Sequence, residues 1–354
     1  MAHLDDIIVL LAPALTLCLA LCLMAVGWVG FSRPWARLAG VNAAATGGKP
    51  ERLGPYRLAN KIGEGAMGEV YRAWHPALGG WRAVKLLPRG ASARDRQRFE
   101  AEARLGAELH HPNTVSIFDR GESRDGTCYY AMELLEGETL QQLVEREGPQ
   151  SPERVVRILM QLCAALDEAH GKGLVHRDIK PENVLLAGER RDVAKLIDFG
   201  LVARVGAVAD STSLDVLVGT PLYMSPEAIL APEAIDARAD LYGLGAVAYF
   251  LLRGAPVFHG RSVVEVCSHH LHTAPEPLSA LLGEALSPEL EALILSCLAK
   301  DPAARPQSAA ELGRRLARCI EPAPLCLAAM RAQRMLDRLE AVVSSAGARC
   351  PIAA

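Results

Sequence analysis

The chain has 354 residues, 50% hydrophobic and 22% charged, a balance that excludes disordered and collagen-like proteins. Its 41 acidic and 38 basic residues give a formal net charge of −3, so no overall basic field favours non-specific binding to nucleic acid. The nine cysteines include no Cys-x-x-Cys pair, which favours reduced thiols in a cytosolic domain over a disulfide framework.

An apolar run without a single charged side chain occupies residues 7–31. A helix of that length spans about 37 Å at 1.5 Å per residue, more than the roughly 30 Å hydrocarbon core of a bilayer. The run therefore predicts a transmembrane helix. A cleaved signal peptide is a weaker alternative because Asp5 and Asp6 replace the basic start that it needs. A buried core helix is also weaker, because the run has no polar face.

The basic residues nearest to this run all follow it, and no Lys or Arg precedes it. The positive-inside rule then places residues 1–6 outside the membrane and everything after the span in the cytoplasm. We expect a single-pass protein of the inner or plasma membrane. Residues 32–55 include a stretch rich in small and turn-forming residues, which predicts a juxtamembrane linker.

A G-x-G-x-x-G pattern, formed by Gly63, Gly65 and Gly68, lies between two segments typical of strands, Tyr56–Ile62 and Glu69–Trp74. Dinucleotide-binding folds share this pattern, but there the glycines lead from a strand into a helix. Here they lead into another strand. The context predicts a glycine hairpin whose backbone N–H groups can lie over a triphosphate.

Lys85 lies in a third predicted strand, Trp81–Leu87. A lysine in an apolar strand is costly unless its ammonium group reaches an anion. If Lys85 is considered without its neighbours, however, a solvated lysine at a sheet edge is the commoner interpretation. A helix predicted over Arg94–Leu109 carries three acids, and spacing alone does not choose which of them pairs with Lys85: Glu100, Glu102 and Glu108.

Two motifs follow a segment predicted to be helical over Val155–His170: His176–Asn183 and Asp198-Phe199-Gly200. The oxygen atoms of Asn183 and Asp198 suit Mg²⁺, a hard ion that shares phosphate oxygens. Asp178 can accept a hydroxyl proton, and Lys180 can neutralise charge on a transferring phosphoryl group. A turn-capping role is the simpler interpretation of one aspartate alone, but the two motifs together favour phosphoryl transfer.

In these motifs the sequence resembles the eukaryotic-like Ser/Thr protein kinases of bacteria, over roughly Tyr56–Ile320. The shared motifs occur in the family order: the glycine pattern, Ala83-Val84-Lys85, His176–Asn183, Asp198-Phe199-Gly200, Ser225-Pro226-Glu227, Asp240 and Arg305. The resemblance implies an α+β, two-lobed protein-kinase fold, with a β-rich N-lobe and a helical C-lobe. It also implies ATP and Mg²⁺, or Mn²⁺, between the lobes.

The resemblance further implies roles for single residues. Glu102 becomes the partner of Lys85, and both join Asp178 and Lys180 as catalytic residues. The gatekeeper is Met132, and the backbone from Glu133 to Leu135 becomes the hinge that binds adenine. Four apolar side chains are expected to enclose the purine: Ile62, Val70, Ala83 and Leu185.

The segment after Asp198 is expected to be the activation segment. Three hydroxyl residues, Ser211, Thr212 and Ser213, lie in a polar part of it. By the family pattern, phosphorylation there would pair the loop with Arg177, so we predict an autophosphorylation site among them, with an ordinary flexible loop as the alternative. Thr220 resembles the residue that lines the acceptor site of Ser/Thr kinases.

Glu227 and Arg305 are predicted to form a buried ion pair in the C-lobe.

Two weaker patterns occur near the end of the chain. Cys267, His269, His270 and His272 could suggest a metal site, but a structural role is favoured because no second cluster completes it. Apolar residues at helical spacing in 321–354 favour a tail packed on the C-lobe, while homodimerisation, membrane contact and disorder stay open.

The sequence thus predicts five parts: residues 1–6 outside the membrane, a span over 7–31, a linker over 32–55, a kinase domain over 56–320 and a tail over 321–354. The expected function is that of a membrane-anchored Ser/Thr protein kinase in signal transduction. Its expected partners are ATP, protein substrates and the membrane, without nucleic acid. A pseudokinase scaffold and a small-molecule phosphotransferase are the alternatives.

Overall fold

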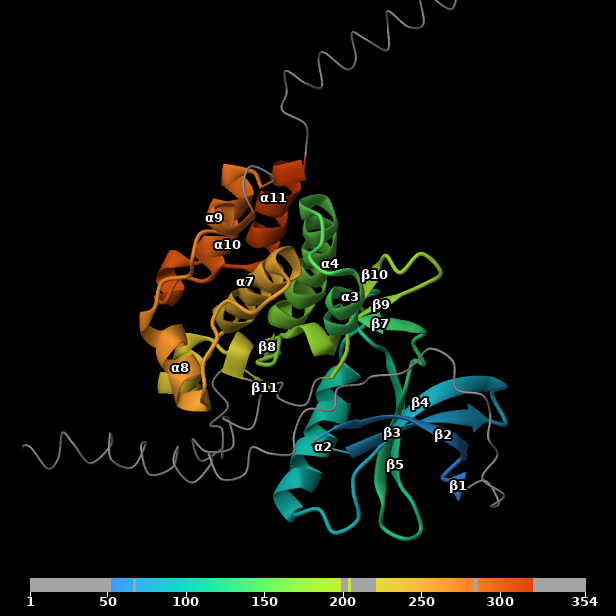
Figure 1. Cartoon of the computed structure of the whole chain (residues 1–354). Helices are drawn as coiled ribbons and strands as arrows, with labels where there is room; N and C mark the ends of the chain where they lie inside the picture. Colours follow the sequence, from blue (N-terminus) through green and yellow to red (C-terminus); the bar gives the residue numbers. More distant parts are fainter. Residues whose placement is uncertain (1–51, 66–67, 199–202, 205–220, 283–285, 321–354) are drawn as a thin grey trace, which may run out of the picture.

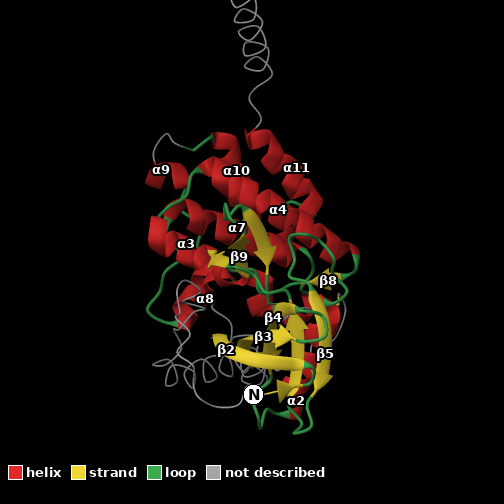
Figure 2. Cartoon of the chain, turned by 90° about the vertical axis from the view of Figure 1, so that its right-hand side faces the viewer, coloured by secondary structure: helices red, strands yellow, loops and turns green. Residues whose placement is uncertain are grey.

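The computed structural model describes residues 52–65, 68–198, 203–204, 221–282 and 286–320. These form two lobes, one dominated by a β-sheet and the other by helices (Figures 1 and 2). This confirms the predicted α+β, two-lobed architecture. The predicted membrane span, most of the linker and the tail lie outside the described residues. Among the described helices, none has both the length and the apolar character needed to cross a bilayer.

The N-lobe contains a six-stranded antiparallel sheet in the order β1-β2-β3-β4-β6-β5. Its strands are β1 (Arg52–Leu53), β2 (Tyr56–Gly65), β3 (Gly68–His75), β4 (Gly80–Leu86), β5 (Ile117–Glu122) and β6 (Cys128–Met132). Two smaller sheets follow, formed by β7 (Gly137–Thr139), β9 (Val184–Ala187) and β10 (Val193–Leu196), and by β8 (Leu174–Val175) and β11 (Ala203–Arg204).

One helix, α2 (Ala93–Gly106), covers the N-lobe sheet (Figure 1). The other described helices belong to the C-lobe: α3 (Leu140–Glu147), α4 (Pro152–Gly171), α6 (Pro226–Leu230), α7 (Arg238–Arg253), α8 (Val263–His272), α9 (Leu278–Leu282), α10 (Pro288–Cys297) and α11 (Ala309–Ile320). Short 3₁₀ turns occupy Pro181–Asn183, Pro221–Tyr223, Pro232–Ala234 and Pro302–Ala304.

The N-lobe sheet is buried on both faces because its strands alternate between two apolar clusters. One face packs against α2 through Leu87, Phe99, Ala103, Cys128 and Tyr130. The opposite face gathers Leu53, Tyr56, Leu58, Ala73, Val84, Tyr129 and Ala131. Leu53 is only 5% exposed and β1 pairs with β2, so the end of the predicted linker packs against the N-lobe sheet.

Two helix boundaries differ from those predicted. The helix expected over Arg94–Leu109 ends three residues earlier, at Gly106, because the amides of Glu108 and Leu109 bond only to carbonyls three residues back. The helix expected over Val155–His170 begins three residues earlier. The Ser151 side chain accepts a hydrogen bond from the Arg154 amide, and a proline follows it at the first helical position, a standard helix start.

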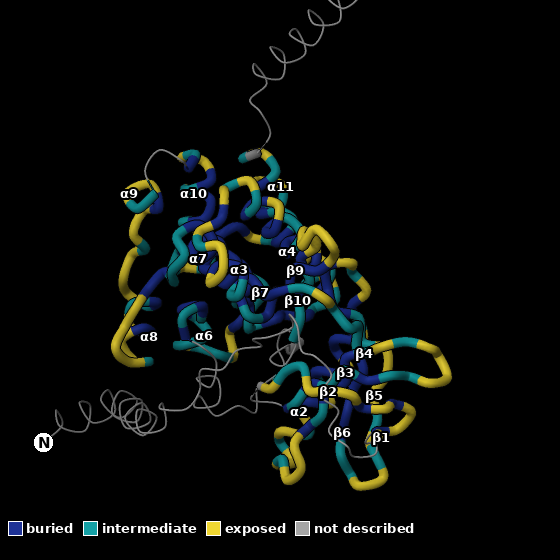
Figure 3. The backbone as a smooth tube through the Cα atoms, turned by 45° about the vertical axis from the view of Figure 1, so that its right-hand side comes forward, coloured by how far each residue is buried: buried dark blue, intermediate teal, exposed yellow. Residues whose placement is uncertain are grey.

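Helix α7 forms the centre of the C-lobe and is buried along almost its whole length (Figure 3). Four of its leucine and valine side chains are fully buried, and each contributes about 1.5–3 kcal/mol relative to an exposed position: Leu241, Leu244, Val247 and Leu251. A rigid helix at this position can serve as a base for the segments that lie on it.

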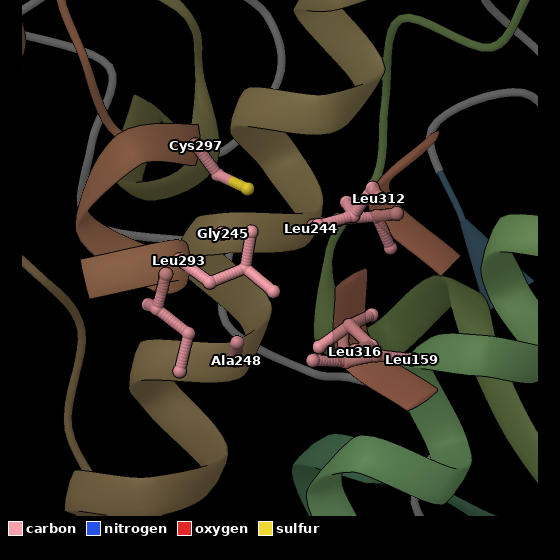
Figure 4. Close-up of a pocket in the computed structure, with 9 residues that line it drawn as sticks. Leu159, Leu244, Gly245, Ala248, Leu293, Cys297, Leu312 and Leu316 are labelled. Carbon is pink, nitrogen blue, oxygen red and sulfur yellow. The ribbon is translucent and has the colours of Figure 1, made fainter. Parts of the chain in front are cut away.

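A small cavity lies where α4, α7, α10 and α11 meet (Figure 4). Its volume of about 10 Å³ would hold at most one water, and its lining of apolar and cysteine side chains gives a water no strong partner. At its wall, Gly245 allows α7 and α10 to approach closely, since a Cβ there would lie 2.6 Å from Cys297 Cβ. The cavity is thus a packing feature of the core.

Candidate active site

The N-lobe half of the candidate site is built on β4, where strand register sets the position of Lys85. Lys85 lies opposite Val70 on β3 and opposite Tyr130 on β6. Directly opposed residues of antiparallel strands share a face of the sheet, as do residues two apart in one strand. Ala83 therefore lies on this face too, opposite Met132. The register alone brings the predicted gatekeeper and two predicted purine contacts next to the lysine.

Lys85 connects the two lobes through its ammonium group. Its Nζ lies 2.6 Å from Glu102 Oε1 and 3.4 Å from Asp198 Oδ1. Lys85 and Glu102 are 5% and 2% exposed, so this ion pair is buried. The pairing that the resemblance implied is present, whereas Glu100 is exposed and Glu108 follows the end of α2.

The ammonium group of Lys85 thus lies beside two carboxylates, those of Glu102 and Asp198. Burial lowers the pKa of Lys85, but Asp198 and Glu102 outweigh it and hold that pKa well above its ordinary value. Burial raises the pKa of Asp198, but Lys85 outweighs it, so the pKa of Asp198 lies well below its usual range. Burial raises the pKa of Glu102 to about 7, against the lowering effect of Lys85. Lys85 therefore stays positively charged beside the place where an anionic ligand would lie.

The C-lobe half contains the predicted base, Asp178. The Asn183 Nδ2 donates to Asp178 Oδ2 at 2.8 Å and to its backbone carbonyl at 2.9 Å. Lys180 Nζ lies 2.7 Å from the same Oδ2. Burial lowers the pKa of Lys180, but Asp178 outweighs it and raises the pKa overall. Two donors from neighbouring positions therefore fix the orientation of this carboxylate.

Asp240 on α7 holds this irregular segment in place. Its Oδ1 accepts from the Arg177 amide at 2.8 Å, and its Oδ2 accepts from the His176 amide at 2.9 Å. His170 Nε2 lies 2.8 Å from Oδ2. Arg177 has a φ of +65°, a left-handed conformation that costs energy in a non-glycine residue. The buried carboxylate supplies the hydrogen bonds that stabilise it.

Asn183 and Asp198, the predicted metal ligands, are held close together by backbone contacts. Asn183 precedes β9 and Asp198 follows β10, and the Ile197 amide donates to the Asn183 carbonyl at 2.9 Å. Because Nδ2 of Asn183 is engaged by Asp178, its amide oxygen is the atom left for a ligand. An amide oxygen and a carboxylate are hard donors, so this set fits Mg²⁺, and equally Mn²⁺.

The predicted hinge follows β6 directly and is not part of a strand. The Glu133 amide donates to the Ser116 carbonyl at 2.9 Å, and the Glu133 carboxylate pairs with Lys195 Nζ at 2.8 Å. These contacts attach the connection that runs to Leu135 firmly to both lobes. Leu185, a predicted purine contact, lies on β9 and is only 5% exposed.

The glycine hairpin joins β2 and β3 as predicted. Gly63 lies opposite Val70, Gly65 lies opposite Gly68, and Ile62 is half-buried. Gly68 has a φ of +144°, and a Cβ there would lie 2.0 Å from the Leu86 carbonyl oxygen. Only glycine fits this position. The tip, residues 66–67, lies outside the described residues.

On the acceptor side, Glu227 and Arg305 form the predicted buried pair, with distances of 2.6 and 2.7 Å between their oxygens and nitrogens. The hydroxyl residues predicted for the activation segment lie outside the described residues: Ser211, Thr212, Ser213 and Thr220. Phe199 and Gly200 do so too.

Two of the cysteine and histidine residues of α8, Cys267 and His270, are buried in the packing of the C-lobe, whereas His272 is exposed. His270 is fully buried, and its Nδ1 lies 2.7 Å from the Tyr242 hydroxyl, while Cys267 is 6% exposed in the core. Over the described ranges, no three His, Cys, Asp or Glu side chains are arranged to hold a metal ion.

Two residues with direct contacts to the site were not predicted. His170 supports Asp240, and Tyr130 donates a hydrogen bond to Glu102 at 2.6 Å. A weak signal existed, since the adjacent Tyr129 and Tyr130 bring two hydroxyls into a strand that is apolar elsewhere. The partner of Tyr130 lies 28 residues away, so no local pattern reveals it.

Comparisons with known proteins agree with this geometry. The protein kinase domain family matches residues 56–315. Over 262 residues, 72% of this chain, the sequence is 39% identical to Serine/threonine-protein kinase pkn3 of Myxococcus xanthus. Over 273 residues, 74% of this chain, it is 40% identical to Serine/threonine-protein kinase PknB of Mycobacterium tuberculosis. The matched regions cover 48% and 42% of these relatives, so the chain spans less than half of each. By this match and by its site, the chain belongs to the protein kinase family, among the bacterial Ser/Thr type.

Proposed function

We propose that the protein transfers the γ-phosphate of ATP to serine or threonine hydroxyls of proteins. The observation that carries this proposal is the position of Lys85 Nζ, 2.6 Å from Glu102 and 3.4 Å from Asp198, because it joins the two lobes around one charge. Phosphoryl transfer needs positioning and charge neutralisation more than covalent chemistry, and this arrangement offers both.

Each residue of the site has a distinct role in this proposal. The charged Lys85 binds phosphate oxygens, and the apolar face of the sheet holds the adenine against the hinge. Asp178, oriented by Asn183 and Lys180, orients the acceptor hydroxyl and takes its proton. Lys180 offsets negative charge near the transferred group. A divalent ion held by Asn183 and Asp198 would neutralise charge on the phosphates.

Serine and threonine specificity rests on Lys180, two residues after the base, and on Thr220, together with the names of the relatives. We extend the proposal to autophosphorylation at one or more of Ser211, Thr212 and Ser213. The support is their position in the activation segment and the partly buried Arg177 beside the base.

The test uses the full chain with radiolabelled ATP, Mg²⁺ and a generic basic protein, followed by phosphoamino-acid analysis. We expect label on phosphoserine and phosphothreonine, and none after Asp178→Asn or Lys85→Met. Equal labelling of both variants would indicate a contaminating kinase. Nucleotide binding without any labelling would favour a pseudokinase scaffold, and label on a small molecule alone would favour the phosphotransferase alternative.

We also propose that residues 7–31 anchor the protein in the membrane with residues 56–320 in the cytoplasm. The uncharged run and the basic residues downstream of it support this topology. The test compares the full chain with a variant lacking residues 7–31 in fractionated cells. We expect the full chain in the membrane fraction after a high-salt wash, and an equally membrane-bound deletion variant would contradict the proposal.

A further inference from the structure

Tyr130 contacts a deeply buried charge of the site, the carboxylate of Glu102. Its side chain is 3% exposed, and its hydroxyl donates to Glu102 Oε1 at 2.6 Å. The same carboxylate oxygen accepts from Lys85 Nζ, also at 2.6 Å. Two donors therefore converge on one oxygen of the glutamate that α2 presents.

Strand register explains why the two donors converge. Lys85 and Tyr130 are directly opposed on β4 and β6, so their side chains leave the same face of the sheet about 5 Å apart. The Lys85 ammonium lies 5.7 Å from the centre of the Tyr130 ring. The pair acts as a single cross-strand unit whose two polar ends meet Glu102.

Tyr130 also contacts α2 at a second point. Its ring lies 5.1 Å from the ring of Phe99, measured between centroids. Phe99 and Glu102 are three residues apart on α2, so they lie on the same side of the helix. Ring packing against one residue and a hydrogen bond to the other fix both the rotation and the distance of α2 relative to the sheet.

The buried carboxylate of Glu102 needs this second donor. Lys85 divides its charge between Glu102 and Asp198, so it satisfies Glu102 only in part. A buried carboxylate with too few donors is costly, and a neutral hydroxyl adds a donor without adding charge. Burial and Glu102 raise the pKa of Tyr130 well above its ordinary value, so the hydroxyl keeps the proton that it donates.

We propose that Tyr130 is a positioning residue that keeps α2 where Glu102 can pair with Lys85. This inference rests on the proposed role of Lys85 in phosphoryl transfer and names a residue that supports it. Loss of the hydroxyl should lower the share of molecules in which the ion pair is formed, while the adenine contacts at the hinge stay intact.

The first experiment compares Tyr130→Phe with Tyr129→Phe in the full chain. The control removes a hydroxyl from the neighbouring tyrosine, which packs on the opposite face of the same sheet. We expect Tyr130→Phe to lower kcat about tenfold with KM for ATP within about twofold, the size expected for losing a hydrogen bond to a charged group. Tyr129→Phe should stay within about twofold in both. Full activity of Tyr130→Phe would overturn the proposal.

A double-mutant cycle tests whether the hydroxyl acts through Glu102. In a Glu102→Ala background, which is itself less active, Tyr130→Phe should change kcat less than twofold. A tenfold loss in both backgrounds would contradict the proposal, because the hydroxyl would then act elsewhere.

Hydrogen exchange supplies a readout that needs no catalysis. Amides of α2 around Glu102 should exchange several-fold faster in Tyr130→Phe than in Tyr129→Phe. Equal exchange in the two variants would overturn the proposal even if the protein phosphorylated nothing. Absence of phosphorylation in the wild type, with faster exchange in Tyr130→Phe, would instead contradict the proposed function alone.

Discussion

The two halves of the site are held in place by different means. Lys85 owes its position to a regular strand, whose register also places Val70 and Ala83 beside it. Asp178 lies in an irregular segment whose backbone is held by the side chain of Asp240. Strand register and the buried Lys85–Glu102 pair fix the N-lobe half, whereas hydrogen bonds to one buried carboxylate hold the backbone of the C-lobe half. Outside the cluster of Lys85, Glu102 and Tyr130, single substitutions should therefore damage the C-lobe half more than the N-lobe half.

The largest effect is expected from Asp240→Ala, which leaves the buried amides of His176 and Arg177 without their acceptor. We expect a loss of about 3–5 kcal/mol in the free energy of unfolding and a fall in kcat of at least about 100-fold. Urea unfolding and the phosphorylation assay measure the two effects. The control is Asp236→Ala, whose partly exposed pair with Arg238 should contribute less than about 1 kcal/mol. Equal losses of stability in Asp240→Ala and Asp236→Ala would contradict the view that buried polar contacts hold the C-lobe half of the site.

The next effect concerns Arg305, whose side chain is fully buried and binds both carboxylate oxygens of Glu227. Arg305→Ala should cost about 3 kcal/mol of stability, because it leaves a carboxylate that is only 13% exposed without its cation. The kcat of the folded fraction should change little, since Arg305 does not contact the site. Arg315→Ala is the matched control, because its pair with Glu311 is exposed and longer, at 3.6 Å. An equally small loss for Arg305→Ala would contradict the prediction.

A smaller effect depends on pH and comes from His270 on α8, which contacts Tyr242 of α7. Burial lowers the pKa of this side chain to about 4, below its ordinary value of 6.5. Between pH 6.5 and pH 4, His270 is therefore protonated in the unfolded chain but stays neutral in the folded protein. The free energy of unfolding is therefore unaffected by this group above pH 6.5. It falls as the pH decreases below 6.5, by about 2 kcal/mol at pH 5.

Urea unfolding at pH 7 and pH 5 measures this loss. His270→Gln keeps a polar group for Tyr242 and removes the titration, so its stability should depend less on pH between these values. The same pH dependence in both proteins would show that other groups cause the acid sensitivity.

The smallest effect is expected in the glycine hairpin of the N-lobe. Lys61 Nζ lies 2.7 Å from Glu64 and 2.6 Å from Glu69, but all three side chains are at least one-third exposed. Lys61→Met should change the free energy of unfolding by less than about 1 kcal/mol and leave kcat nearly unchanged. A loss as large as that of Arg305→Ala would show that the hairpin, too, depends on a single polar contact.

The same contrast explains what the sequence could predict. The glycine hairpin and the strand of Lys85 follow from local patterns, and both were predicted correctly. The partner of Lys85 followed only from the family resemblance, because spacing alone does not distinguish the three acids of the predicted helix. Tyr130 and the full role of Asp240 were not predicted, since their partners lie 28 and more than 60 residues away. Side chains that act through tertiary contacts leave no periodic trace in the sequence.

In the proposed mechanism, Asp178 acts on the acceptor hydroxyl while Lys85 and the hinge bind the nucleotide. The most direct test measures the affinity for Mg²⁺-ATP and the rate of phosphorylation in the same preparation of Asp178→Asn. We predict that the rate falls by about 10²–10⁴-fold while the dissociation constant stays within about twofold of the wild type. A parallel loss of affinity and rate, or a rate that survives the substitution, would contradict the assignment.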